Sequence, residues 1–382
     1  MKATGRIKVL HLISGLNTGG AEKTLFNLAT SMDRSRFQNI IVSMKDLGIL
    51  GKELNRHGFT VMALGMIKGF PDPRGIVRLF EIISMLKPDL IQCWMYHANI
   101  LGLFAGLSRP VLWNIRCSNM DLSKYGVTYR MSVKAGAWAS KLPYCIVTNS
   151  KAGKTWHEDL GYKPRRWRVI PNGFDTSTYR PDNKARSRIR QMLGIPEDAF
   201  VIGHIARLDP MKDHSTFFKA AHMMSEVHDR VHFILAGRGI SEDSPYIIQL
   251  ARKMPRNTLH LLGERNDIPD ILNALDVCTL ASHGEGMPNV IGEAMSCAIP
   301  CVVTDIGDSA SMVESTGIVV PPESSDALYQ AWLKLFISGR ETLKEMGMRA
   351  RARVMRLFSI ASMVNSYEAL YLEAHKHTNS SK

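Results

Sequence analysis

Two glutamates separated by seven residues, Glu285 and Glu293, lie on either side of a turn rich in glycine and proline. Apolar runs at 277–280 and 300–304 predict one strand before the turn and another after the following helix. Glu285 would then lie in the loop, and Glu293 about two turns further on in the helix. The backbone N–H groups of residues 286–289 would face a ligand in front of the helix, because the first N–H groups of a helix attract negative charge. Two glutamates at this spacing are common by chance, so the pair needs further support.

Two cations give that support. Arg207 and Lys212 follow the predicted strand 201–206, and open α/β sheets bind ligands at the carboxyl ends of their strands. A guanidinium can hold a phosphate through two hydrogen bonds, and an ammonium acts as a point charge. The alternative is two basic residues on an exposed loop. Two cations, two carboxylates and a helix N-terminus in one domain predict a site for a nucleoside diphosphate, with acceptors for sugar hydroxyl groups.

A glycine-rich turn, residues 14–22, follows the first predicted strand, 7–13, and precedes a helix. Such a turn lets the backbone approach a ligand closely, and the helix start favours a phosphate or a developing negative charge. The turn lacks the glycine spacing and the later acidic residue of a dinucleotide site. A tight turn without a ligand is the alternative.

Short β-branched runs alternate with segments of helical period twice along the chain. The first series ends near a turn at 171–173, and the helical segment 184–193 opens the second. This alternation predicts an α/β protein with two parallel sheets, each covered by helices on both faces. We expect domains at residues 1–178 and 179–359, with the helical segment 360–376 packing back on the first. Segments 326–338 and 341–356 are predicted as separate helices.

The chain has 382 residues and a formal net charge of +13, of which residues 109–168 contribute +9 (twelve Lys or Arg against three acidic residues). This stretch suits an anionic membrane surface or an anionic acceptor, and a solvated basic face is the alternative. The six cysteines form no CxxC pair, and we interpret them as reduced core residues. With no apolar run of spanning length and no signal peptide, we expect a cytoplasmic protein, peripheral on the inner membrane if its acceptor is anchored there.

Six motifs, spread in order over most of the chain, resemble glycosyltransferase family 4, whose members have the GT-B fold and retain the anomeric configuration. The resemblance implies two Rossmann-like domains that face each other across a cleft, the first on the acceptor side and the second holding the donor. The motifs are Gly19-Gly20-Ala21-Glu22, Ile170-Pro171-Asn172-Gly173-Phe174-Asp175, Arg207 with Lys212, Glu285-x7-Glu293, Pro300-Cys301-Val302-Val303-Thr304-Asp305, and Gly317-Ile318-Val319-Val320-Pro321-Pro322.

The resemblance also implies roles for individual residues. Arg207 and Lys212 would hold the donor diphosphate, Glu293 would accept hydrogen bonds from the ribose, and Glu285 would contact the transferred sugar. His97, which follows the predicted strand 90–93, would face the donor sugar, although a lone histidine there is more often a core residue. The remaining donor-binding candidates are Gly19, Gly20, Arg265, Gly286, Met287, Pro288, Asn289 and Val290.

The expected reaction transfers a hexose from a UDP- or GDP-sugar to a hydroxyl group of a glycan or a lipid-linked acceptor, as in bacterial O-antigen, capsule or exopolysaccharide synthesis. We find no Asp-x-Asp at a strand end and no carboxylate suited to act as nucleophile, so we expect no cofactor, no metal, and displacement on one face of the sugar. The alternatives are an epimerase of the same fold, a non-catalytic subunit, and a nucleic-acid-binding protein. The last lacks any recognised motif, so we expect no nucleic-acid partner.

Overall fold

The computed structural model describes residues 5–17, 19–66, 72–106, 109–118, 122 and 125–380. The chain divides into two compact units. Unit 1 comprises Met1–Gly173 and Ile360–Lys382, and unit 2 comprises Phe174–Ser359. The division falls five residues before the boundary at 178 expected from the sequence.

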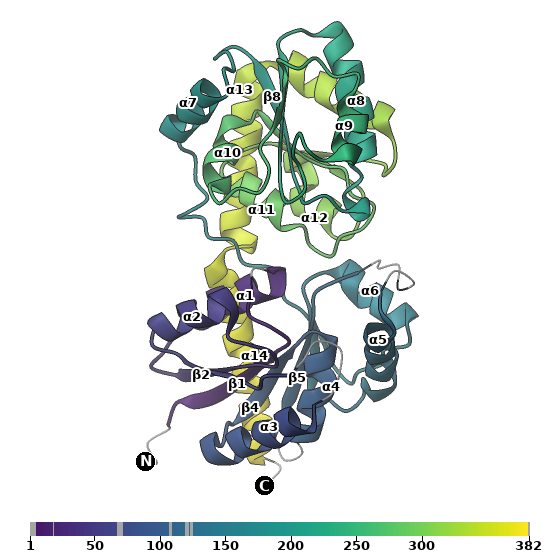
Figure 1. The fold of residues 1–382 in the computed structure, drawn as a ribbon. Coiled ribbons are helices and arrows are strands. Elements are labelled where there is room, and N and C mark those ends of the chain that lie inside the picture. Colours follow the sequence, from purple (N-terminus) through teal and green to yellow (C-terminus); the bar gives the residue numbers. More distant parts are fainter. Residues whose placement is uncertain are drawn as a thin grey trace. The chain divides into compact units, whose positions relative to one another are not determined.

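Unit 1 contains a parallel sheet of seven strands within the described residues, in the order β3-β2-β1-β4-β5-β6-β7 (Figure 1). Strand order reverses between β1 and β4, which pair from Val9 with Leu90 to Ile13 with Trp94. The strands are β1 (Ile7–Ile13), β2 (Phe37–Ser43), β3 (Thr60–Ala63), β4 (Leu90–Trp94), β5 (Val111–Ile115), β6 (Cys145–Thr148) and β7 (Trp167–Val169).

Helices cover both faces of this sheet. Buried side chains of α1, α2 and α14 form one core with the sheet, and those of α3, α4 and α5 form the other. The chain's last helix, α14 (yellow in Figure 1), lies in unit 1, where Tyr371 donates a 3.3 Å hydrogen bond to Gln92. The helices are α1 (Gly20–Ser31), α2 (Gly48–Arg56), α3 (Pro73–Leu86), α4 (Tyr96–Ala105), α5 (Val127–Ala139), α6 (Lys151–Asp159) and α14 (Ile360–Ser380).

Unit 2 contains a parallel sheet of six strands within the described residues, in the order β10-β9-β8-β11-β12-β13. Its strand order reverses between β8 and β11, where Val277 pairs with Ile202. The strands are β8 (Phe200–Ile205), β9 (Val231–Ala236), β10 (Leu259–Leu261), β11 (Val277–Leu280), β12 (Cys301–Thr304) and β13 (Gly317–Val320).

The helices of unit 2 also form two cores. One core contains side chains of α7, α10, α11 and the end of α13, and the other contains side chains of α8, α9 and the beginning of α13. The helices are α7 (Asn183–Met192), η2 (Pro210–Lys212), α8 (His214–Val227), α9 (Pro245–Ala251), α10 (Ile268–Ala274), α11 (Asn289–Ser296), α12 (Ser309–Val313), η3 (Glu314–Thr316) and α13 (Ser325–Leu357).

The strands predicted at 7–13, 90–93, 201–206, 277–280 and 300–304 agree with the structure to within two residues, since long apolar runs predict buried parallel strands well. The two helices predicted at 326–338 and 341–356 form the two parts of α13, which meet at a kink where Gly339 has non-helical angles (φ 80°). The cysteines are unpaired thiols, and all but the partly buried Cys117 are buried, as expected.

Candidate active site

The cations predicted to bind a diphosphate lie on the loop after β8. Arg207 donates from Nε and Nη2 to the Asp209 carboxylate, at 3.1 and 2.7 Å. Asp209 also accepts a 2.9 Å bond from the backbone N–H of Met211, the middle residue of the short helix η2 (Pro210–Lys212). The Arg207 side chain is 55% exposed, so its guanidinium can be reached by an anion from solvent.

Lys212 forms an ion pair with Glu285, which lies on the loop after β11. The Ser282 hydroxyl donates a 3.1 Å hydrogen bond to the same carboxylate oxygen, Oε1 of Glu285. The backbone N–H of His283 donates to the Met211 carbonyl at 2.8 Å and ties the two loops together. The Lys212 and Glu285 side chains are 19% and 15% exposed, so their charges are shielded from most of the solvent.

The turn at Glu285 is supported from behind by the loop after β12. Gly307 has φ +56°, and a Cβ on it would lie 2.1 Å from the Glu285 carbonyl oxygen. The backbone N–H of Asp308 donates to the Gly286 carbonyl at 2.9 Å. Only glycine combines this backbone conformation with so close an approach. Gly307 therefore sets the path of the Glu285 turn.

Glu293 lies on α11, which begins directly after Pro288 in an extended conformation. The Tyr179 hydroxyl hydrogen-bonds to the Glu293 carboxylate. Burial raises the pKa of Tyr179, and the neighbouring Glu293 raises it further, so the phenol stays a donor at neutral pH. Tyr179 was not predicted, because it lies in the segment between β7 and α7 and carries no motif of its own.

The other donor-binding candidates of unit 2 lie at the start of α11 and in the loop between β10 and α10. Met287 is buried, and Asn289 and Val290 form the first turn of α11, as predicted from the glycine and proline before them. Arg265 lies before α10 and makes a two-point contact with Asp267, from Nε to Oδ1 at 2.8 Å and from Nη2 to Oδ2 at 2.5 Å.

In unit 1, the glycine-rich turn leads directly into α1. Gly19 precedes the helix, and Gly20 is its first residue. A Cβ on Gly19 would lie 2.2 Å from Oε2 of Glu22, so the Glu22 carboxylate folds over the start of its own helix. Thr18, in the same turn, lies outside the described residues.

His97 is the second residue of α4, after the end of β4. Met95, which precedes that helix, has φ 72°, a strained conformation for a residue with a side chain. Burial lowers the pKa of His97, and the nearby Lys45 lowers it further, so the imidazole is neutral at pH 7. Gly19, Gly20 and His97 thus follow β1 and β4, the strands between which the order of unit 1 reverses.

The predicted residues of unit 2 gather in the same way. Arg207 and Lys212 follow β8, and Glu285 follows β11, so all three lie where the strand order of unit 2 reverses. Of these, Lys212 and Glu285 are in contact, whereas Arg207 bonds to Asp209. Open α/β sheets bind ligands at such reversals, outside the carboxyl ends of the strands. The signal for Asp209 and Ser282, which we did not predict, was the same position after a strand.

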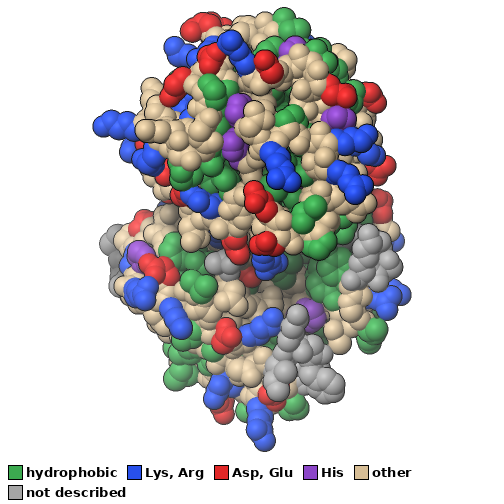
Figure 2. Space-filling view, turned by 45° about the horizontal axis from the view of Figure 1, so that its top comes forward, with side chains coloured by type: hydrophobic (Ala, Val, Ile, Leu, Met, Phe, Trp, Pro, Cys, Tyr) green, Lys and Arg blue, Asp and Glu red, His purple; other side chains and the backbone are tan. Residues whose placement is uncertain are grey.

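The basic stretch 109–168 is less uniform than its charge suggests. Arg166 and Arg168 form ion pairs with Glu373 of α14, at 3.2 and 3.0 Å. Figure 2 shows the Lys and Arg side chains of the visible face as separate groups among acidic and apolar ones. Asp121 and Lys124 lie outside the described residues.

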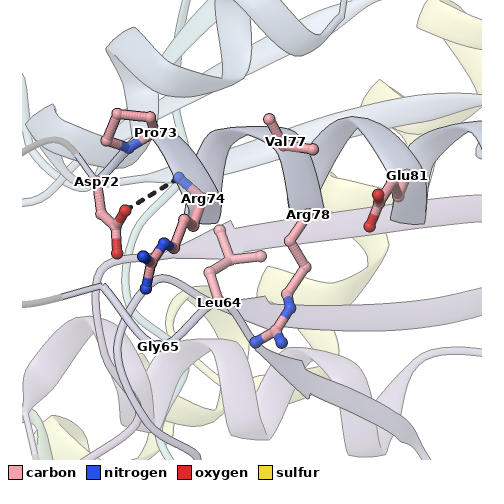
Figure 3. A pocket seen from close by; sticks show the side chains of 8 residues that line it. All are labelled: Leu64, Gly65, Asp72, Pro73, Arg74, Val77, Arg78 and Glu81. Carbon is pink, nitrogen blue, oxygen red and sulfur yellow. Dashed lines mark hydrogen bonds between the residues drawn. The ribbon is translucent and has the colours of Figure 1, made fainter.

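A groove of about 560 Å³ lies between the end of β3 and α3 in unit 1. Figure 3 shows Arg74 and Arg78 extending from α3 towards Leu64 and Gly65. The groove contains none of the predicted site residues, so we assign it no role in the reaction.

Among the described residues, no group of three or more His, Cys, Asp or Glu side chains is arranged to hold a metal ion. Metal independence remains a prediction. No helix in the described ranges has both the length and the apolar composition needed to cross a membrane.

Known proteins share this architecture. A solved structure of Anabaena Alr3699/HepE in complex with UDP superposes with a TM-score of 0.84 at 24% identity, and the match covers 96% of this chain and 100% of that one. Sucrose-phosphate synthase from Thermosynechococcus elongatus gives a TM-score of 0.79 at 18% identity, over 96% and 98% of the two chains. The fold of this chain, with its two parallel sheets, is that of the GT-B glycosyltransferases.

The sequence of this chain matches the models of known glycosyltransferase families. The model for glycosyl transferases group 1 matches residues 199–337, and the model for glycosyltransferase family 4 matches residues 18–178. An Escherichia coli UDP-Gal:alpha-D-GlcNAc-diphosphoundecaprenol alpha-1,3-galactosyltransferase is 26% identical over 390 residues, which cover 98% of this chain and 99% of the relative. The chain belongs to the family 4 (group 1) glycosyltransferases and is an enzyme of the hexosyltransferase class.

Proposed function

We propose that this protein transfers a hexose from a UDP-sugar to a hydroxyl group of a lipid-linked diphosphate acceptor during the synthesis of a bacterial surface polysaccharide. The transfer retains the anomeric configuration and requires no metal ion. The observation that carries the proposal is the Lys212–Glu285 ion pair, which lies beside Arg207 where the strand order of unit 2 reverses.

The chemistry of this pair fits a nucleotide-sugar donor. Lys212 and Arg207 would neutralise the diphosphate, which gains negative charge as it leaves. Preorganised charges stabilise such a transition state, and the charge of Lys212 is shielded from most of the solvent. Glu285 and Glu293 can accept hydrogen bonds from sugar and ribose hydroxyl groups, respectively. UDP is favoured over GDP because the similar HepE structures contain UDP or UDP-glucose and the E. coli relative is named for UDP-Gal.

The proposed step occurs on one face of the sugar. The bond between the anomeric carbon and the UDP oxygen breaks, and its electron pair stays on the diphosphate. The acceptor oxygen then forms a bond to the anomeric carbon from the same face and gives its proton to the leaving phosphate oxygen. His97 of unit 1 would contact the transferred sugar, and the backbone of the Gly19–Gly20 turn would approach the distal phosphate of the donor.

A lipid-linked acceptor is supported by the diphosphoundecaprenol in the name of the E. coli relative and by an exposed face of α5. Val127, Met131 and Trp138 recur at helical spacing on that face and are 60%, 62% and 86% exposed. Arg130 and Lys134 are exposed on the same helix. Exposed aromatic and apolar side chains with neighbouring cations are typical of helices that lie on anionic bilayers, so we propose that α5 contacts the membrane surface.

Donor and membrane binding can be tested separately. Purified protein with EDTA should release UDP from one UDP-hexose only when a lipid diphosphate sugar is added. Turnover of the donor without any acceptor would instead indicate an epimerase or a hydrolase. Trp138→Ser should weaken flotation with anionic vesicles, whereas Ile337→Ser, which changes an equally apolar exposed residue of unit 2, should not. Equal flotation of both variants would refute the membrane role of α5.

A further inference from the structure

Arg116, directly after β5, is a cation whose hydrogen-bond partners are all neutral. Its Nη2 donates to the Thr24 hydroxyl at 3.0 Å and to the Asn172 side chain, and Nη1 donates to Asn114 Oδ1 at 3.4 Å. The Tyr367 hydroxyl of α14 is a further partner. Among the described residues, no carboxylate lies within 4.0 Å of this guanidinium.

A shielded cation without a carboxylate partner attracts anions strongly. Burial lowers the pKa of Arg116, because removing the guanidinium from water disfavours its charge. Neutral oxygens satisfy its N–H groups but give its charge no directly bonded counter-ion, and a shielded charge is costly unless it is paired. An anion that reaches Arg116 would therefore bind with little competition from water.

Two more charged side chains lie at the same edge of the sheet. Lys45 follows β2, and its Cδ lies 3.8 Å from the position of a Cβ on Gly15, so it extends along the glycine-rich turn. Burial raises the pKa of Glu22, while its own backbone N–H, Lys45 and Arg116 act to lower it. Glu22 therefore lies within the electrostatic range of both cations.

The position of Glu22 indicates that the start of α1, near Arg116 and Lys45, binds a negatively charged group. Its carboxylate folds over Gly19 at the start of α1, where helix N–H groups favour negative charge. Thr24, one turn further along α1, contacts Arg116. The chain thus supplies its own anion at the start of α1, within the electrostatic influence of Lys45 and Arg116.

We propose that Arg116 and Lys45 form a phosphate subsite in unit 1, which binds a phosphate group of the acceptor diphosphate, and that Glu22 holds the place of this anion while the subsite is empty. The assignment to the acceptor rests on the proposed function. It is favoured over the donor because Arg207 and Lys212 of unit 2 already match the charge of a donor diphosphate. The subsite would select acceptors that carry a phosphate next to the sugar.

The direct test titrates inorganic pyrophosphate into the full-length protein, already saturated with UDP, by calorimetry at low and constant ionic strength. Replacing one cation with a neutral side chain should weaken binding about tenfold or more, the effect of one lost charge-assisted hydrogen bond. Glu22→Gln should have the opposite effect and strengthen binding, since it removes the competing carboxylate. Opposite changes in pyrophosphate affinity distinguish a phosphate subsite from a general loss of stability, which would weaken binding in every variant.

Arg116→Met can fail to fold, because Arg116 also links β5 to α1 and to Tyr367. Within the described residues, the Lys45 side chain forms no hydrogen bond or ion pair of this kind, so Lys45→Met serves as the second variant. Arg116→Lys keeps the positive charge and should retain part of the pyrophosphate binding that Arg116→Met loses. Pyrophosphate binding that is unchanged in Lys45→Met and Glu22→Gln would overturn the proposal. Loss of UDP binding in these variants would assign the subsite to the donor and would equally overturn it.

The kinetic test separates this proposal from the proposed function. With a sugar diphosphate lipid as acceptor, Lys45→Met should raise the KM of the acceptor and leave the KM of UDP-hexose unchanged. If the wild-type protein binds pyrophosphate through Arg116 and Lys45 yet transfers no sugar to any diphosphate lipid, the proposed acceptor is wrong while the subsite stands.

Discussion

Lys212→Met removes the cation of the most shielded ion pair in the candidate site. Glu285, which is 15% exposed, then loses its cation and keeps the hydrogen bond from the Ser282 hydroxyl. Removing one partner of a fully buried pair costs about 3–5 kcal/mol. The pair is partly exposed, so we expect a smaller loss, of about 1–3 kcal/mol in the free energy of unfolding of unit 2. For a domain of this size, each kcal/mol lowers Tm by roughly 2–4 °C.

The double variant Lys212→Met/Glu285→Gln separates stability from catalysis. It removes both charges, and the amide of Gln can still accept from Ser282, so stability should return close to that of the wild type. Activity should not return, because the leaving diphosphate still lacks its cation. Loss of one such charge in a preorganised site costs about 10²–10³-fold in kcat.

The assays are differential scanning calorimetry without ligand and UDP release with saturating UDP-hexose and acceptor. Wild-type kcat/KM in the double variant would refute the role of Lys212 at the diphosphate. Recovery of both stability and activity would show that the pair is purely structural.

Three further predictions concern the support of the site and the fold. Gly307→Ala should destabilise unit 2 by about 1–3 kcal/mol, through a positive φ and a clash with the Glu285 carbonyl. Gly194→Ala, also in unit 2 and at positive φ (+65°) but with no atom within 4 Å, is its control and should cost less; equal losses would contradict the clash. Tyr179→Phe should raise the KM for UDP-hexose more than it lowers kcat, because Glu293 loses its hydrogen-bond donor; an unchanged KM would contradict this. Burial lowers the pKa of His204 to about 3 in the folded protein, whereas in the unfolded chain the imidazole keeps its ordinary pKa of 6.5. As the pH drops from 6.5 towards 4, the unfolded chain binds the proton more readily than the folded one, so the free energy of unfolding should fall. His204→Phe should flatten that loss in urea unfolding, and an unchanged slope would contradict it.

Much of the fold could be predicted because its signals are local. Strands such as β1 and β9 are apolar runs buried on both faces, and a run of that kind has few other stable arrangements. The break within α13 was predictable for the same reason. Gly339 is typical of a helix end, and its non-helical angles separate the two helical segments expected at 326–338 and 341–356.

The candidate site could be predicted where position after a strand was the signal. Arg207, Lys212 and Glu285 follow β8 and β11, and the topology of a parallel sheet brings such residues to one edge. The contacts themselves were not predictable. Tyr179 meets Glu293, and Arg116 meets Tyr367, across 114 and 251 residues of sequence, and only the tertiary fold decides such pairs. Arg116 was counted as part of a basic surface, although its place after β5 was the same signal that identified Arg207.

The most direct test of the central claim is the binding of UDP, GDP and ADP to the full-length protein in EDTA, measured by thermal shift. The account predicts that UDP raises Tm, since a ligand at 100 times its Kd stabilises by about 2.7 kcal/mol. The shift should be lost in Lys212→Met/Glu285→Gln. No shift with any nucleotide, or an equal UDP shift in the wild type and the double variant, would contradict the donor site proposed around Arg207, Lys212 and Glu285.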